Sequence, residues 1–422
     1  MLQSMKIIGG YPLFGEISIS GAKNLALPAI VTTLLTDNEI TLNNVPNLSD
    51  VTSLLELLEY LGCDINHDTA HKQLILKTTN IKHTEAPYDF VRKMRASILV
   101  LGPMIARFGR ASVSFPGGCA IGVRAIDLHI RTLQLLGAEV TIDNGFIKAY
   151  SPNGLTGCDI TFPIVTVTGT ENSIMAAVLA NGTTRLINAA MEPEVEELCN
   201  LLNNMGAKIT GQGTSTITIE GVESLHGTTF DIMPDRIEAG TYAIASAITH
   251  GKLLLKNCIY NHLEIFFNTL KSNGVSITQQ DNGVLVENNN DKINSIDIST
   301  APYPGFPTDL QAQYMALMTI SEGVSLITEN LFENRLMHTQ ELNRMGANII
   351  VKGNTATVKG VENLNGAPVM ATDLRASASL ILAGLVAKGE TTVNRLYHID
   401  RGYENIDNKL LQCGAHIKRI TV

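Results

Sequence analysis

Tryptophan is absent from this chain of 422 residues, and aromatic residues make up only 5% of it. Aliphatic side chains must therefore form most of the core, and a hydrophobic share of 45% supplies enough of them. The chain has no excess of basic residues, because its net charge is −9. Binding to nucleic acid along a phosphate backbone requires a basic face, so we expect no nucleic-acid partner.

Long apolar runs are also lacking. No stretch of about 18 uncharged apolar residues occurs, so the sequence predicts no membrane insertion. The N-terminus enters a strand pattern without the apolar centre of a signal peptide, which predicts a cytoplasmic protein. The six cysteines are scattered and form no CxxC pair, which argues against a disulfide framework or a zinc ribbon.

What the chain does contain is a unit of roughly 70 residues that recurs six times. Each unit has a glycine followed by a short apolar strand pattern, and several have a second glycine turn before an alternating strand, as at Gly182, Gly323 and Gly389. The period is longer than that of common solenoids, so each unit is predicted to be a small α+β module. Six modules fit two domains of three. The repeated glycines are Gly62, Gly137, Gly206, Gly274, Gly346 and Gly414.

Every unit also holds an apolar helix without a polar face, which predicts burial. These helices are expected at 25–35, 97–108, 173–180, 242–250, 314–321 and 377–388. Polar residues stand at or just before each expected start, where free N–H groups and the helix dipole favour an anion. Such residues are either local caps or part of an anion site, and the pattern alone leaves both open. They are Lys23, Asn24, Arg95, Glu171, Asn172, Glu238, Asp309 and Arg375.

Two loops differ from their equivalents in the other units. In 115–124 (FPGGCAIGVR), paired glycines allow close approach to Cys119, and Arg124 would favour its reactive thiolate. The alternative is an inert small side chain in a glycine-rich turn. In 303–311 (YPGFPTDLQ), prolines stiffen a loop that delivers Asp309 to a helix start. Asp309 is there either a general base or only a helix cap.

Taken together, these segments resemble the motifs of the UDP-N-acetylglucosamine enolpyruvyl transferases, in family order along essentially the whole chain. The resemblance implies an α/β fold of α+β repeats, a two-domain inside-out α/β barrel with six βαβαββ units. Domain I would comprise 1–22 and 234–422, and domain II, with the Cys119 loop, 23–233. The motifs are GAKN (21–24), MRASI (94–98), PGGCAIG (116–122), DLH (127–129), PGFPTD (304–309), FENR (332–335), TDLR (372–375) and DRGY (400–403).

The same resemblance implies transfer of the enolpyruvyl group of phosphoenolpyruvate to the 3′-hydroxyl of UDP-N-acetylglucosamine. Phosphate is released through a tetrahedral ketal, in the first committed step toward peptidoglycan, and no metal or organic cofactor is implied. Cys119 would be the acid, forming a reversible thioether with phosphoenolpyruvate, and the residue that fosfomycin alkylates. Asp309 would accept the proton of the 3′-hydroxyl. Lys23, Arg124 and Arg401 would hold phosphate and carboxylate groups, which suit arginine forks.

The remaining family positions are assigned to substrate binding or its support. Ala125 stands where the family often has proline, and Thr168 where it often has glycine, both in segments whose backbone does much of the nucleotide binding in the family. The substrate-binding residues are Asn24, Arg95, Arg335, Arg375 and Leu331, with uridine and diphosphate contacts at Arg124, Ala125, Ile126, Asp127, Leu128, His129, Thr166, Val167 and Thr168, and with Asp373 and Glu192 supporting the site.

Three alternatives remain beside this interpretation. An enolpyruvylshikimate phosphate synthase shares the fold and the donor but lacks the Gly-Gly-Cys loop around Cys119. An RNA 3′-phosphate cyclase uses related repeats, but the net charge of −9 and the lack of a nucleotidyl-accepting histidine motif argue against it. A non-catalytic repeat scaffold would not need Lys23, Arg95, Asp309 and Arg401 at corresponding positions.

Overall fold

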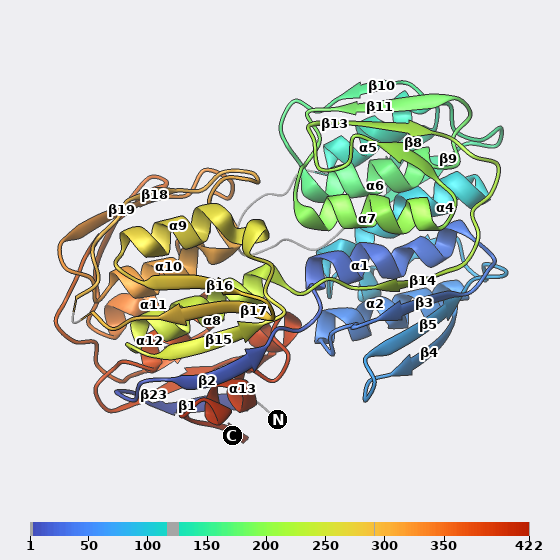
Figure 1. The fold of residues 1–422 in the computed structure, drawn as a ribbon. Coiled ribbons are helices and arrows are strands. Elements are labelled where there is room, and N and C mark those ends of the chain that lie inside the picture. Colours follow the sequence, from blue (N-terminus) through green and yellow to red (C-terminus); the bar gives the residue numbers. More distant parts are fainter. Residues whose placement is uncertain (1–2, 116–125, 291, 422) are drawn as a thin grey trace. The chain divides into compact units, whose positions relative to one another are not determined.

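The computed structural model describes residues 3–115, 126–290 and 292–421, which fall into two compact units (Figure 1). Residues 3–20 and 234–421 build the first unit, and residues 21–115 and 126–233 build the second. Each unit has its own hydrophobic core. None of the described helices is long and apolar enough to cross a membrane.

The first unit alternates helices and short strands, with 3-10 helices labelled η. Its elements are β1 (Gln3–Ile8), β2 (Phe14–Ser18), α8 (Arg236–Ile248), β15 (Lys252–Lys256), η3 (Tyr260–Leu263), α9 (Glu264–Ser272), β16 (Ser276–Gln280), β17 (Gly283–Glu287), β18 (Ile298–Ser299), η4 (Thr308–Leu310), α10 (Gln311–Met318), β19 (Val324–Thr328), α11 (Thr339–Arg344), β20 (Asn348–Lys352), β21 (Thr355–Lys359), β22 (Pro368–Met370), α12 (Leu374–Gly384), β23 (Glu390–Asn394), η5 (Leu396–Arg401), α13 (Ile406–Gln412) and β24 (His416–Thr421).

The second unit repeats the same alternation. Its elements are α1 (Lys23–Val31), η1 (Thr32–Leu35), β3 (Ile40–Asn43), α2 (Ser49–Leu61), β4 (Asp64–Asp68), β5 (Gln73–Lys77), β6 (Glu85–Ala86), α3 (Tyr88–Val91), η2 (Arg95–Val100), α4 (Leu101–Phe108), β7 (Arg110–Ser114), α5 (Asp127–Leu135), β8 (Glu139–Asp143), β9 (Phe146–Tyr150), β10 (Asp159–Thr161), α6 (Val167–Ala177), β11 (Thr183–Ile187), α7 (Pro193–Asn204), β12 (Lys208–Thr210), β13 (Thr216–Glu220) and β14 (Thr228–Asp231).

The strands form six four-stranded sheets within the described residues, three in each unit. In every sheet one edge strand is parallel to its neighbour, and the other two pairings are antiparallel. The run β10–α6–β11–α7–β12–β13 shows the unit most simply, and the predicted βαβαββ repeat is confirmed.

Two sheets take strands from distant parts of the sequence. β1 lies between β23 and β24 and pairs antiparallel with both, and β2 pairs in parallel with β15. β1 therefore completes a sheet with β22, β23 and β24, and β2 completes a sheet with β15, β16 and β17. In the second unit, β14 closes the sheet opened by β3.

The repeated glycines follow the ends of helices α2, α5, α7, α9, α11 and α13. All six have φ between 92° and 114°, a left-handed conformation that would cost another residue roughly 1–2 kcal/mol. After each glycine, the next N–H donates to the carbonyl five residues earlier, as from Cys63 to Leu58 at 2.9 Å. This is the hydrogen bond of a Schellman helix terminus, so the repeat period marks where a helix stops and a strand begins.

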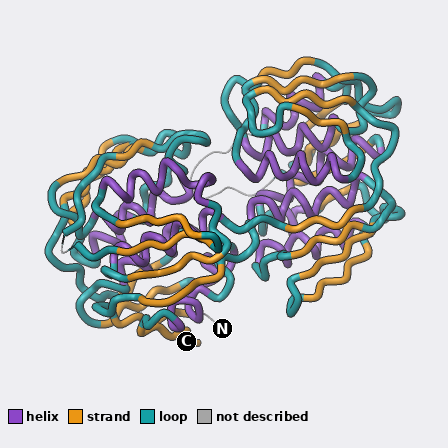
Figure 2. Tube along the Cα trace, in the orientation of Figure 1, coloured by secondary structure: helices purple, strands orange, loops and turns teal. Residues whose placement is uncertain are grey.

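The apolar helices are confirmed as the buried elements of each unit. Every residue of α8 and α10 is buried, and α10 packs against α12, with α8 in contact with both. In the second unit α4 packs against α6. Figure 2 shows the helices inside each unit and the strands outside them. This arrangement agrees with the predicted inside-out barrel.

Two predicted helix starts are wrong. α6 begins at Val167 and α8 at Arg236, both earlier than the expected residues 173 and 242. The Asp235 carboxylate accepts the Ile237 and Glu238 N–H groups at 2.7 and 3.0 Å, so the cap precedes the apolar run. Thr166 caps α6 in the same way, through the Gly169 N–H. Glu171, Asn172 and Glu238 consequently lie inside helices rather than before them.

Candidate active site

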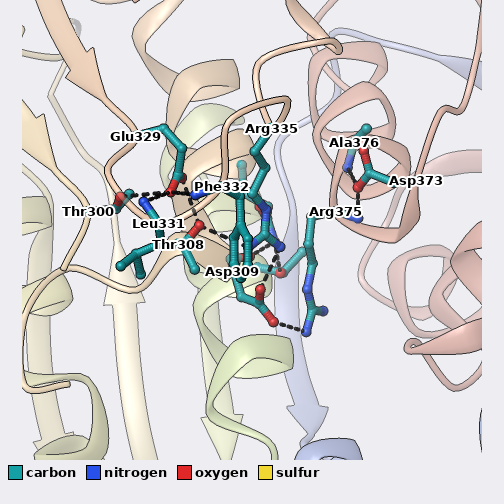
Figure 3. Close-up of polar contacts among 12 residues, drawn as sticks. Thr300, Thr308, Asp309, Glu329, Leu331, Phe332, Arg335, Asp373, Arg375 and Ala376 are labelled. Carbon is teal, nitrogen blue, oxygen red and sulfur yellow. Dashed lines mark hydrogen bonds and ion pairs between the residues drawn. The ribbon is translucent and has the colours of Figure 1, made fainter. Parts of the chain in front are cut away.

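Asp309 is held between two arginines in the first unit. It lies in η4, which begins directly after Pro307. Its Oδ1 is 2.5 Å from Arg335 Nη2, and its Oδ2 is 2.7 Å from Arg375 Nη2 (Figure 3). Each arginine side chain is 5% exposed, whereas that of Asp309 is 25% exposed. The structure thus brings together three predicted site residues from three separate segments, around a carboxylate that ligands can reach.

The two arginines govern the basicity of Asp309. Burial alone would raise its pKa, but the charges of Arg375 and Arg335, and the hydrogen bonds they donate, hold the pKa well below its usual range. The carboxylate is therefore ionised and a weak proton acceptor in this arrangement. An anionic ligand that draws away one guanidinium would make it a stronger base, because that charge would no longer stabilise the ionised form.

Arg335 has a second hydrogen-bond partner besides Asp309. Its Nη1 donates to Thr308 Oγ1 at 2.9 Å, and the Thr308 hydroxyl donates to Glu329 Oε2 at 2.7 Å. Figure 3 shows the series of hydrogen bonds that runs from Glu329 through Thr308 and Arg335 to Asp309. Neither Glu329 nor Thr308 stood out in the sequence as a functional residue.

Arg375 is supported in a comparable way. Its Nη1 donates to the Tyr403 hydroxyl at 3.3 Å. Tyr403 is 2% exposed and also contacts Thr241 Oγ1 at 2.8 Å and Gln313 Nε2 at 3.1 Å. Both arginines therefore have a second hydrogen-bond partner that fixes the orientation of the guanidinium toward Asp309.

Three other predicted residues lie near these elements. Asp373 caps α12, accepting the Arg375 and Ala376 N–H groups at 2.8 and 3.0 Å, so it places Arg375 at the start of that helix. Leu331 follows β19 and is 38% exposed. Arg401 ends η5, which packs against α12.

In the second unit, Lys23 is the first residue of α1 and forms a buried ion pair. Its Nζ lies 2.5 Å from Asp50 Oδ2, with 10% and 5% of the two side chains exposed. Asp50 is in the first turn of α2, where a negative charge also favours the helix dipole. Lys23 is thus held by a carboxylate that the sequence analysis did not single out. Asn24 follows it on α1 and is partly exposed.

His129 is buried in a fixed orientation. The Gly102 N–H donates to Asn172 Oδ1 at 2.8 Å, which leaves the Asn172 amide nitrogen to donate to His129 Nδ1 at 3.0 Å. Burial, followed by the charge of Arg95, lowers the pKa of His129 to about 4. The ring is therefore neutral near pH 7 and carries its proton on Nε2.

Asn172 consequently has a structural role, in place of the helix-start role expected from the sequence. A β-carbon on Gly102 would lie 2.4 Å from its Oδ1, so the glycine permits the close packing of α4 on α6. Arg95 is partly exposed and begins η2, as expected.

The predicted nucleotide-binding segments surround two helix N-termini. Thr166 caps α6, and the half-buried Val167 and Thr168 are the first two residues of that helix. Asp127 begins α5 and is exposed, whereas Ile126 and Leu128 are buried. Free N–H groups at helix starts suit phosphate, so both segments are chemically compatible with the expectation.

Glu171 in α6 interacts electrostatically with two carboxylates at the start of α7. Burial, and then the charges of Glu194 and Glu192, raise the pKa of Glu171 well above its usual range. Glu171 is 2% exposed, so burial disfavours its charged form, and its carboxylate neighbours do not suit an anion. The helix-start role expected for Glu171 is therefore wrong.

Three predicted residues, Cys119, Arg124 and Ala125, lie outside the described residues. Burial raises the pKa of all five cysteines in the described part of the chain, to about 12 for Cys199 and Cys258. Those five thiols are therefore poor nucleophiles at neutral pH. Among the described residues, no group of His, Cys, Asp or Glu is arranged to hold a metal ion.

Comparisons with known proteins agree with these observations. Residues 7–410 match the sequence model of EPSP synthase (3-phosphoshikimate 1-carboxyvinyltransferase). The chain is 54% identical over 420 residues to the UDP-N-acetylglucosamine 1-carboxyvinyltransferase of Granulibacter bethesdensis, covering 100% of both chains. It is also 54% identical over 419 residues to the protein of that name from Acidiphilium cryptum, covering 99% of this chain and 100% of the other.

Solved structures with the same fold include two enolpyruvyl transferases. The NikO enzyme from Streptomyces tendae matches with a TM-score of 0.89 at 23% identity, over 100% of this chain and 99% of that chain. An EPSP synthase from Acinetobacter baumannii matches with a TM-score of 0.77 at 16% identity, over 100% of each chain. At these identities the likeness is one of fold.

Proposed function

We infer the activity from one premise: the chain belongs to the EPSP synthase family of 1-carboxyvinyl (enolpyruvyl) transferases. It transfers the enolpyruvyl group of phosphoenolpyruvate to the 3′-hydroxyl of UDP-N-acetylglucosamine and releases phosphate. The acceptor follows from the name of the full-length relatives at 54% identity. The structural observation that best supports the chemistry is the Asp309 carboxylate held by Arg335 and Arg375.

The reaction needs an acid and a base at the same time. As the 3′-hydroxyl oxygen attacks C2 of phosphoenolpyruvate, its proton must leave and a proton must arrive at C3. The tetrahedral ketal then loses phosphate together with one C3 proton, which restores the double bond. We propose that Asp309 accepts the hydroxyl proton and that Cys119 delivers the proton to C3.

Asp309 can perform this step only after its environment changes. With both arginines in place, their charges outweigh the effect of burial and lower the pKa of Asp309. The carboxylate is therefore ionised and accepts a proton only weakly. Arg335 and Arg375 are also the groups that an anionic substrate would engage, since arginine forks bind carboxylate and phosphate oxygens. Substrate binding would therefore make Asp309 more basic as it positions the hydroxyl.

The remaining assignments are proposals of the same kind. Lys23, Arg124 and Arg401 hold the phosphate and carboxylate of phosphoenolpyruvate. The neutral His129 ring offers an Nε2–H donor, which suits a phosphate or carbonyl oxygen of the sugar nucleotide. The other proposed contacts come from Asn24, Arg95, Ala125, Ile126, Asp127, Leu128, Thr166, Val167, Thr168 and Leu331, with Asp373 and Glu192 as supporting residues.

We further propose that this transfer is the first committed step of peptidoglycan synthesis and takes place in the cytoplasm. The rival acceptor is 3-phosphoshikimate, the substrate in the name of the matching family model. Its enzymes lack the Gly-Gly-Cys loop present at 117–119. The acceptor named by the full-length relatives is therefore preferred.

A phosphate-release assay tests the proposal. The purified chain is supplied with phosphoenolpyruvate and either UDP-N-acetylglucosamine or 3-phosphoshikimate. We expect phosphate release with the sugar nucleotide and none above background with 3-phosphoshikimate. Release with 3-phosphoshikimate alone would overturn the assigned acceptor.

A further inference from the structure

We propose that Glu329 is a positioning residue for the transfer reaction, which sets Arg335 against Asp309 through the Thr308 hydroxyl. This inference rests on the proposed function and extends it to a residue that touches neither substrate nor reacting atoms.

Glu329 is a buried carboxylate that accepts hydrogen bonds from three segments, including the turn that leads to Arg335. It follows β19 directly and is 2% exposed. Its Oε1 accepts the Leu331 N–H at 2.8 Å, the Phe332 N–H at 3.2 Å and the Thr300 hydroxyl at 3.0 Å. The first two hydrogen bonds fix the turn that leads to Arg335, whose own N–H donates to the Phe332 carbonyl at 3.3 Å.

The other oxygen of Glu329 acts on the tip of the same arginine. Thr308 has a single hydroxyl proton, which it donates to Glu329 Oε2 at 2.7 Å. A lone pair of Thr308 Oγ1 is thereby free to accept from Arg335 Nη1 at 2.9 Å. Because an ionised carboxylate only accepts, Glu329 leaves the hydroxyl no other orientation.

Glu329 therefore fixes Arg335 at both its backbone and its guanidinium. With Nη1 on Thr308, Nη2 of the same planar fork lies 2.5 Å from Asp309 Oδ1. The fork is rigid, so a change at Nη1 also moves Nη2. Loosening Arg335 would weaken its charge at Asp309, and the pKa of Asp309 would rise because one of its two arginines stabilises the ionised form less.

The sharpest test is Glu329→Gln, which keeps the shape of the side chain. Its amide oxygen can still accept the Leu331 and Phe332 N–H groups, but its amide nitrogen now donates toward Thr308. The Thr308 proton then loses its acceptor, so the hydroxyl no longer has one fixed orientation beside Arg335. We expect kcat to fall about tenfold and the acidic limb of the pH–rate profile to move to higher pH, with KM for UDP-N-acetylglucosamine within about threefold of wild type.

Two further variants separate positioning from a merely structural role. Thr308→Val removes the same link independently and should reproduce the shifted acidic limb, whereas Thr308→Ser keeps the hydroxyl and should restore the wild-type profile. Thr300→Val removes a hydrogen bond to the other oxygen of Glu329 and leaves Thr308 in place. It should lower the melting temperature without moving the pH profile.

The outcomes distinguish this inference from the proposed function. A wild-type chain that releases no phosphate contradicts the function itself. An active wild type with an unshifted acidic limb in both Glu329→Gln and Thr308→Val would overturn the role of Glu329 alone. An equal shift in Thr300→Val would show that the profile follows general loosening of the segment, which would also overturn it.

Discussion

Arg375 Nη2 lies 2.7 Å from Asp309 Oδ2, and 5% of the arginine side chain remains exposed. This buried contact keeps the proposed base ionised and weak until a ligand competes for the guanidinium. A general base whose pKa stayed this low throughout the reaction would accept a proton poorly. Here, however, the arginines that lower the pKa of Asp309 are also the groups that we propose an anionic substrate engages. Basicity is thereby coupled to substrate binding.

Replacing Arg375 should change the pH dependence of the reaction. In Arg375→Gln the pKa of Asp309 should rise, because burial would then be opposed by Arg335 alone. Activity requires the ionised carboxylate, so the acidic limb of kcat/KM should move up by about one pH unit or more. Arg344→Gln, which alters a side chain that is 62% exposed, is the matched control and should leave the limb in place. An unchanged limb in Arg375→Gln would contradict the coupling.

The ion pair of Lys23 and Asp50 should matter for stability. Asp50→Asn leaves a buried ammonium without its carboxylate, which should lower the free energy of unfolding by about 3 kcal/mol. Inorganic phosphate should recover part of this loss if Lys23 binds anions as proposed. Denaturant titration with and without phosphate measures both effects. The control, Glu56→Gln, breaks an exposed pair with Lys93 and should cost less than about 1 kcal/mol. A similar loss in both variants would show that the buried pair has no special role.

His129 should remain neutral through the physiological range. Its pKa is lowered to about 4 by burial and Arg95, from 6.5 in the unfolded chain, so the unfolded state binds a proton that the folded state does not between these values. Stability is therefore full above about pH 6.5 and should fall as the pH drops toward 4, by on the order of 3 kcal/mol. The ring signals assigned by comparison with His129→Gln should not titrate between pH 5 and 8. Titration near pH 6.5 would contradict the buried, neutral ring.

Cys119 should be the thiol that fosfomycin alkylates. Burial raises the pKa of the five described cysteines, so none of them competes well for an electrophile at neutral pH. We expect inactivation to be faster with UDP-N-acetylglucosamine present. Cys119→Asp should escape it and keep some turnover, because a carboxylic acid can also donate a proton. Cys158→Ala should behave as wild type, and an adduct mapped to any cysteine other than Cys119 would refute the assignment.

Much of the architecture could be predicted because it depends on local chemistry. The repeated glycines, such as Gly62, adopt positive φ at helix ends, so one backbone requirement recurs with the module and is visible in the sequence. The buried helices were visible for a similar reason, since they lack a polar face. Their starts were misplaced where a cap such as Asp235 stands several residues before the apolar run.

Two supporting residues of the candidate site, Asp50 and Glu329, could not be predicted in this way. Asp50 reaches Lys23 only because α2 packs against α1, and Glu329 acts through a hydroxyl in a different segment. Neither residue belongs to a local pattern, because each owes its role to a hydrogen bond or ion pair made across the fold. The charged groups that face a ligand are visible in sequence motifs, whereas Asp50 and Glu329, which hold two of them in place, are visible only in the structure.

The most direct test of the central claim is to identify the product. The chain is incubated with phosphoenolpyruvate labelled with ¹³C at C2 and with UDP-N-acetylglucosamine, and the sugar nucleotide is examined by mass spectrometry and NMR. The account predicts a sugar nucleotide heavier by one enolpyruvyl group, with the labelled carbon in an enol ether at the 3′-oxygen and one phosphate released for each product molecule. An unmodified sugar nucleotide, or a label attached at any other position, would contradict it.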